Sequence, residues 1–87
     1  METSSLSSLQ AKLDEFYVFP CRYVFKFIAP LARIDDMTAL FQGRVFFSRY
    51  SRKGKYVSFT AEWEVASSEE VISVYRRASA IQGVIAL

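Results

Sequence analysis

The segment from Arg49 to Thr60 constrains the fold of this chain more than any other. Its two ends are rich in aromatic and β-branched residues, as in β-strands, and its centre is a basic stretch that contains Gly54. A tight hairpin loop needs a residue at positive φ, and glycine adopts that conformation without steric cost. A three-residue loop, Arg52-Lys53-Gly54, requires it only at Gly54. The segment therefore predicts a β-hairpin with a basic tip.

The length of this loop decides which side chains of the hairpin face the core. With three loop residues, Phe47 lies beside Phe59 on the core face. Phe46, Tyr50 and Tyr56 then lie on the opposite face. A shift of one residue would turn Phe46 and Tyr50 inward, so this assignment depends on the loop.

The remaining segments predict two more strands and two helices after an N-terminal lead-in. Alternation marks the strands, and apolar stripes mark the helices; Ser67 and Glu70 have the spacing of a capping box, and Gly43 and Gly83 end the helices. The predicted elements are a lead-in helix over 5–15, a strand over 21–29, a helix over 31–41, strands over 44–51 and 55–65, a helix between Ser67 and Gly83, and a strand over 84–87.

This order predicts an α+β fold, the ferredoxin-like βαββαβ two-layer sandwich. Its four-stranded antiparallel sheet has the order 4-1-3-2, with two helices on one face. Residues 16–87 are expected to form this single domain, and residues 1–15 a flexible lead-in with a short helix. One face of the sheet is left open.

Size and composition narrow the classes of protein. A chain of 87 residues with 52% hydrophobic and 23% charged residues suits one small globular domain. Its net charge of +2 indicates neither a nucleic-acid nor a membrane partner. The sequence shows no signal-peptide pattern and no apolar stretch that could span a bilayer, so we expect a soluble cytoplasmic protein.

The chain lacks the residues that most catalytic and metal sites use. It contains no His and one cysteine, Cys21, so neither a thiolate zinc site nor a histidine-assisted nucleophile can form. Glu62 and Glu64 share a strand face, where we interpret them as cross-strand partners of Arg44 and Lys26. We therefore expect no catalytic residues, no metal, no cofactor and no enzymatic activity.

Several segments of the chain resemble a known family. They are Phe19–Ile28, Ser51–Ser58, Glu70–Tyr75 and Gly83–Ile85, and the Ser-x-x-Gly-x-Tyr-x-Ser pattern of the hairpin is the most specific of them. Together they resemble the YbeD-like domain-of-unknown-function family over roughly residues 16–87. The resemblance implies a bacterial-type protein with a ferredoxin-like fold similar to the ACT-type regulatory domains of amino-acid enzymes. It implies no activity and no functional residues, and segment 31–43 is shorter than the family's first helix.

Binding through the open face of the sheet is the favoured functional hypothesis. The predicted apolar patch consists of Val24, Ile28, Phe46, Tyr50 and Tyr56, and such patches commonly mark interaction sites. A protein partner or a second copy would bind there. The alternative is that the lead-in helix folds over this face and covers it.

Two other binding hypotheses rank lower. A small molecule, bound as in ACT-like regulatory domains, would lie near residues 29–33. That loop is apolar, and a plain connection between strand and helix is the favoured interpretation of it. RNA would bind the basic hairpin through Arg49, Arg52, Lys53 and Lys55. The competing interpretation is a solvated tip whose charges protect a sheet edge from aggregation, so nucleic acid ranks last.

Overall fold

Two long strands, β1 (Cys21–Pro30) and β3 (Tyr56–Val65), form the centre of the computed structural model, which describes residues 3–87. They pair antiparallel over their whole length, from Cys21 opposite Val65 to Pro30 opposite Tyr56. Because apolar residues alternate with polar ones in both strands, one face of the pair is continuously apolar. That face carries the buried side chains of Phe25, Phe27 and Phe59.

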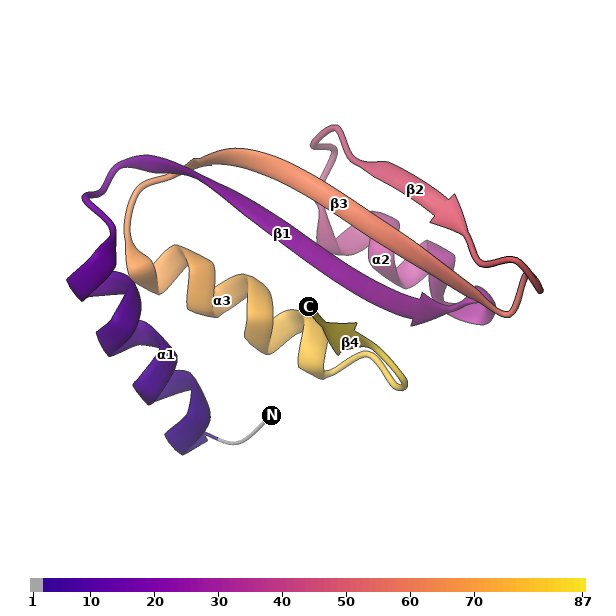
Figure 1. Ribbon diagram of the computed structural model, residues 1–87, viewed down its shortest axis with the longest axis horizontal. Helices are drawn as coiled ribbons and strands as arrows, with labels where there is room; N and C mark the ends of the chain where they lie inside the picture. Colours follow the sequence, from indigo (N-terminus) through magenta and orange to yellow (C-terminus); the bar gives the residue numbers. More distant parts are fainter. Residues whose placement is uncertain (1–2) are drawn as a thin grey trace.

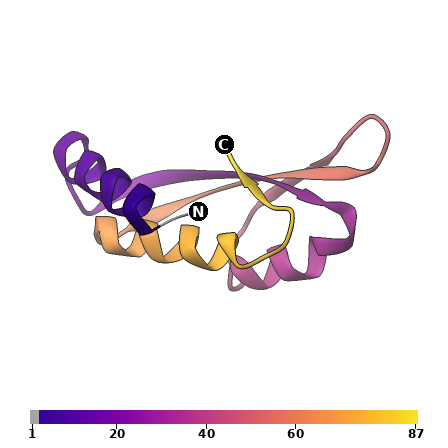
Figure 2. The same cartoon turned by 90° about the horizontal axis from the view of Figure 1, so that it is seen from below.

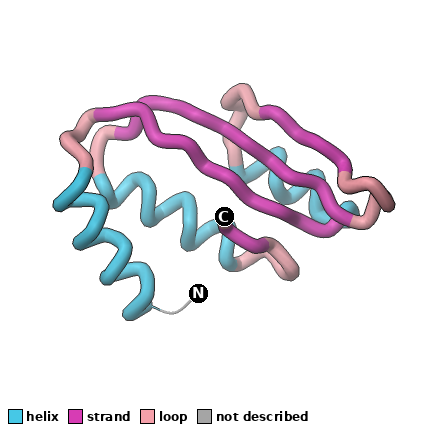
Figure 3. The backbone as a smooth tube through the Cα atoms, viewed as in Figure 1, coloured by secondary structure: helices cyan, strands magenta, loops and turns pink. Residues whose placement is uncertain are grey.

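The other elements complete the predicted ferredoxin-like sandwich (Figure 1). The sheet order is β2-β3-β1-β4, which confirms the predicted order read from the opposite edge. Helices α2 and α3 cover one face, and the other face is open (Figure 2). Figure 3 shows the same arrangement by type of element. The remaining elements are α1 (Thr3–Phe16), the 3-10 turn η1 (Leu31–Arg33), α2 (Ile34–Leu40), β2 (Phe47–Tyr50), α3 (Ser68–Ser79) and β4 (Ile85–Ala86).

Aromatic rings fill the space between the sheet and α3. The ring of Phe25 stacks on that of Trp63 with a centroid distance of 4.4 Å and approaches that of Tyr75 at 5.8 Å. The apolar stripe of α3 adds Val71 and Val74 to this cluster. Burial of such large side chains is the main stabilising term, at about 2–3 kcal/mol for each.

Helix α1 packs against α3 at the side of the sandwich (Figures 1 and 2). Leu6 and Leu13 on its inner face belong to the buried core, and Gln10 Nε2 donates a hydrogen bond to Ser68 Oγ at 3.4 Å. The lead-in helix is therefore present and longer than predicted. It does not cover the open face, so the alternative in which it hides that face is wrong.

The hairpin register differs from the prediction by one residue. Phe47 pairs with Thr60 and Ser48 with Phe59, so the predicted pair of Phe47 and Phe59 is wrong. The Ser51 amide donates to the Tyr56 carbonyl at 2.8 Å, which leaves a four-residue loop, 52–55, in place of three residues. Gly54 does adopt positive φ, at 71°, as predicted. Glycine at that position suits both loop lengths and does not select between them.

The shift in register exchanges the two adjacent phenylalanines. Phe46 packs on the core, its ring centroid 4.9 Å from that of Phe41 and 5.8 Å from that of Phe59. Phe47 lies on the open face and is 75% exposed. Tyr50 pairs with the buried Val57 and so begins on the helix side of the sheet.

The start of α3 is stabilised differently from the predicted capping box. Ser67 makes no side-chain hydrogen bond to the helix, although it is the residue that precedes it. Glu70 instead accepts hydrogen bonds from the Ala66 amide at 3.0 Å and from Trp63 Nε1 at 3.2 Å. The Arg44 guanidinium lies 4.4 Å above the Trp63 ring and 4.0 Å from Glu70, and not beside Glu62 and Glu64 as predicted.

Candidate functional site

The face of the sheet opposite the helices carries exposed apolar side chains from all four strands. In its cross-strand rows, Ile28 pairs with Ser58 and Ile85, Val24 with Glu62, and Phe47 with Thr60. We call five of these side chains the open-face patch: Val24, Ile28, Phe47, Tyr56 and Ile85. Four of them are between 44% and 75% exposed, and Ile28 is half-buried.

This patch overlaps only partly with the predicted one. Val24, Ile28 and Tyr56 lie on the open face, whereas Phe46 turns to the core and Tyr50 starts from the other face. Phe47 replaces Phe46 because of the register shift. Ile85 was missed, although its alternation with Ala86, which packs against the core, is the signal that could have found it.

The two ends of the open face differ in charge. At one end, Glu62 and Glu64 lie on β3, and Arg22 reaches Glu62 at 3.8 Å. At the other end, the hairpin holds Arg49, Arg52, Lys53 and Lys55. Among residues 3–87, none of these four cations has a carboxylate within 4.0 Å.

A hollow of about 510 Å³ lies at the basic end of this face. The hairpin that forms its wall rises away from the helix layer (Figure 2). We call it the hairpin hollow. It brings together residues that the sequence had assigned to two separate candidate sites, and it is lined by Ile28, Arg49, Tyr50, Ser51, Arg52, Tyr56 and Ser58.

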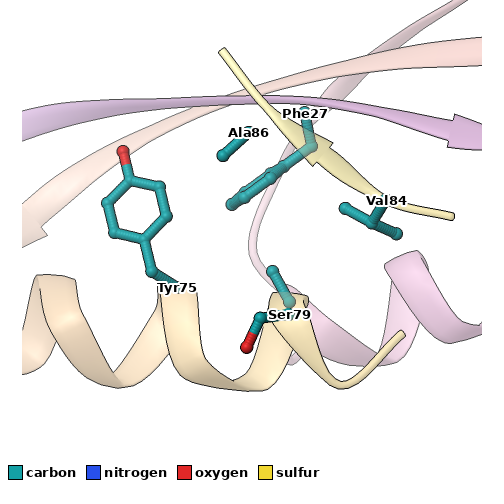
Figure 4. Close-up of a pocket in the computed structure, with 6 residues that line it drawn as sticks. Phe27, Tyr75, Ser79, Val84 and Ala86 are labelled. Atoms are coloured by element: carbon teal, nitrogen blue, oxygen red, sulfur yellow. The ribbon is translucent and has the colours of Figure 1, made fainter. Parts of the chain in front are cut away.

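A second cavity, of about 280 Å³, lies between α3 and β4 (Figure 4). The rings of Phe27 and Tyr75 line it together with Val84 and Ala86, while the Ser79 hydroxyl turns away and donates to the Arg76 carbonyl at 2.8 Å. The Tyr75 hydroxyl is 3.1 Å from that of Tyr23. Burial, and then this hydrogen bond, raise the pKa of Tyr75 above its ordinary value. A phenol held neutral in an apolar cavity is a structural group, not an acid or base for neutral pH.

Hydrogen bonds and an ion pair fix the loop over residues 29–33, where the small-molecule hypothesis placed its ligand. The Leu31 amide donates to the Lys55 carbonyl at 3.0 Å. Arg33 pairs with Asp36 at 3.5 Å and donates to Gln82 at 3.3 Å. The loop therefore connects β1 to α2 and braces the hairpin.

Two further observations concern metals and membranes. In the part of the chain that the structure describes, no three side chains of Cys, Asp or Glu come together in a way that could hold a metal ion. Within residues 3–87, no helix has both the length and the apolar character that crossing a bilayer requires.

Comparison with known proteins identifies the family. A UPF0250 protein of Shewanella woodyi is 35% identical over 83 residues, which cover 87% of this chain and 94% of the relative. UPF0250 proteins of Shewanella sediminis and Shewanella putrefaciens are 34% and 32% identical with the same coverage. No solved structure shows a significant match. The family model described as "Protein of unknown function (DUF493)" matches residues 14–87, and neither description names an activity. These matches confirm the family resemblance seen in the sequence: the chain belongs to the DUF493 family, together with bacterial UPF0250 proteins.

Proposed function

We propose that this protein is a protein-binding domain that acts through the open face of its sheet, and that the surface it binds is the same face of a second copy. The observation that carries the proposal is the open-face patch, which contains exposed apolar side chains from all four strands. Exposed apolar side chains gathered on one face of a domain commonly mark interaction sites. Sheets pack face to face at about 10 Å, with their strands within about 30° of one another.

The second copy is favoured because the open face is complementary to itself. A two-fold axis that lies between two facing copies and runs across the strands at Thr60 reverses the strand direction. It superposes the row of Ser58 on the row of Glu62 of the other copy, because these rows are equally far from Thr60. Such an isologous arrangement needs only one surface on each molecule.

This pairing places apolar side chains opposite apolar side chains of the second copy, and a basic side chain near an acidic one. Phe47, in the row of Thr60, meets its own copy near the axis. Val24, in the row of Glu62, meets Ile28 of the second copy, in the row of Ser58. Arg49, also in the row of Ser58, comes within reach of Glu62 of the second copy. Apolar contacts and a pair of opposite charges thus occur together in the rows on either side of the axis.

The same axis makes one unfavourable contact, which sharpens the test. Lys26 is in the row of Thr60 and therefore faces its own copy. Two like charges that face each other across an interface weaken association. Replacing Lys26 by Gln should therefore tighten the dimer, a result that few other arrangements predict.

Sedimentation equilibrium of the full chain tests the proposal. We expect a concentration-dependent dimer whose dissociation constant rises at least tenfold, or about 1.4 kcal/mol, in Val24→Ser/Phe47→Ser. Val18→Ser/Phe16→Ser is the matched control, because it removes comparably exposed apolar side chains at the α1–β1 corner and should leave the dimer intact. A wild-type protein that stays monomeric at millimolar concentration would overturn the proposal, as would equal weakening by both double variants.

A further inference from the structure

The hairpin hollow has the dimensions of a site for a small molecule. Its floor is the cross-strand row of Ile28, Ser58 and Arg49, and its wall is the raised hairpin with Arg52 and Tyr56. Its volume of about 510 Å³ lies within the range of about 300–1,000 Å³ that is typical of ligand pockets. All of these groups belong to one copy of the chain.

The charge of the hollow is positive and is not neutralised by the protein. Residues 44–61 contain no acidic residue. In the described chain, all three ion pairs lie elsewhere, and none involves Arg49 or Arg52. A guanidinium donates in a planar fork that matches the oxygens of a phosphate group. Two free guanidinium groups beside one hollow therefore favour a phosphate-bearing ligand.

Local hydrogen bonds hold the hairpin that carries these cations. Ser51 Oγ accepts from the Tyr56 amide at 3.2 Å, and the Gly54 amide donates to the Ser51 carbonyl at 2.9 Å. Ser58 Oγ donates to the Arg49 carbonyl at 3.3 Å. The backbone that carries the guanidinium groups is thus organised before any ligand arrives, which lowers the entropic cost of binding.

Aromatic rings complete the lining. Tyr50 and Tyr56 both border the hollow, and both are about half exposed to solvent. A flat heterocyclic ring can stack on such a ring, or on the plane of an arginine. We propose that the hairpin hollow binds a phosphate-bearing ligand of mononucleotide size, with the phosphate at Arg49 and Arg52 and the flat ring against Tyr56.

A single small ligand fits this surface better than a nucleic-acid strand. A strand needs a track of cations and a series of rings on which successive bases stack. On the open face of the described chain, the cations outside ion pairs are those of the hairpin and Lys26. On that face β1 offers Val24 and Lys26 in place of rings.

Titration of adenosine 5′-monophosphate, followed by amide chemical shifts, tests this inference. The protein used is Val24→Ser/Phe47→Ser, at a concentration where sedimentation equilibrium shows a monomer, because Arg49 also comes within reach of Glu62 of the second copy in the proposed dimer. These substitutions lie outside the hollow, so the two proposals fail separately. We expect shifts confined to the hairpin and to Ile28, and a weaker effect of adenosine, which lacks the phosphate.

Substitutions distinguish binding of the nucleotide in the hairpin hollow from non-specific attraction to positive charge. Arg49→Ala/Arg52→Ala should weaken binding at least about tenfold, because both guanidinium groups that donate charge-assisted hydrogen bonds to the phosphate are removed. Arg76→Ala/Arg77→Ala removes the same charge from exposed positions on α3 and should change binding less than about twofold. Tyr56→Leu should weaken binding of the nucleotide but not of inorganic phosphate.

Three results would overturn the inference. One is the absence of any shift in the hollow at 10 mM nucleotide, on the order of the weakest affinities that ligand sites show. The second is equal loss of binding in the two double-arginine variants. The third is tighter binding of a single-stranded oligonucleotide, with shifts that extend along the sheet beyond the hairpin.

Discussion

The two faces of one sheet place the same kind of side chain in opposite surroundings. Phe25 on β1 is fully buried under α3, whereas Phe47 on β2 is 75% exposed on the open face. On the covered face, apolar side chains are explained by the burial they contribute to folding. On the open face they contribute little to folding, so their presence needs another reason. Association is the reason proposed above.

The largest difference in the free energy of unfolding is expected between substitutions of Phe25 and of Phe47. Phe25→Ala leaves a cavity among Trp63, Tyr75 and Phe27 and should lower the free energy of unfolding by about 3–5 kcal/mol. Phe47→Ala should lower it by less than about 0.5 kcal/mol, measured on the monomer. Urea denaturation at low protein concentration measures both. Equal losses for the two variants would mean that Phe47 is part of the fold and not of an interface.

A smaller difference in stability is expected between substitutions of Glu70 and of Glu62. Glu70 accepts two hydrogen bonds at the start of α3, so Glu70→Ala should cost about 1–2 kcal/mol. Glu62 forms an exposed ion pair with Arg22, and Glu62→Ala should cost less than about 1 kcal/mol. Thermal denaturation of the two variants compares them. A Glu70 variant as stable as the Glu62 variant would show that the observed bonds do not stabilise the helix start.

The smallest expected effect is a loss of folding stability at alkaline pH that depends on Tyr75. The pKa of Tyr75 is raised in the folded protein, so above the ordinary tyrosine pKa of 10.0 the unfolded chain loses this proton first. The unfolded state then binds fewer protons than the folded state, and stability falls as the pH rises. The expected loss is about 1 kcal/mol between pH 9 and 11. Tyr75→Phe should reduce this loss; a pH profile of this variant identical to that of the wild type would contradict the assignment.

The sequence largely predicts which side chains lie on the covered face of the sheet, and it does not predict those on the open face. In β1 and β3, apolar and polar residues alternate, so the pattern itself assigns Phe25 and Phe59 to the core. At the start of β2, Phe46 and Phe47 are adjacent and equally apolar, so hydrophobicity cannot select a face. The loop length decides it, and Gly54 suits three or four residues equally. The predicted patch therefore contained Phe46 in place of Phe47.

Two further features depended on tertiary contacts that the sequence does not display. Ser67 and Glu70 have the spacing of a capping box, yet Glu70 bonds to Trp63 and Ala66 because the end of β3 returns close to the helix start. The hairpin hollow forms because the twist of the sheet raises the hairpin over Ile28. Ile28 and the hairpin are far apart in the sequence.

The most direct test of the central claim is a charge exchange within one chain. In the proposed dimer, Arg49 of each copy comes within reach of Glu62 of the other, so Glu62→Arg should weaken dimerisation at least about tenfold. Adding Arg49→Glu should restore dimerisation of the double variant, because the opposite charges then face each other again. Sedimentation equilibrium of the wild type and both variants gives the answer. Restoration is the predicted result; a double variant that stays as weak as Glu62→Arg, or a single variant that dimerises normally, would contradict the pairing of the two open faces.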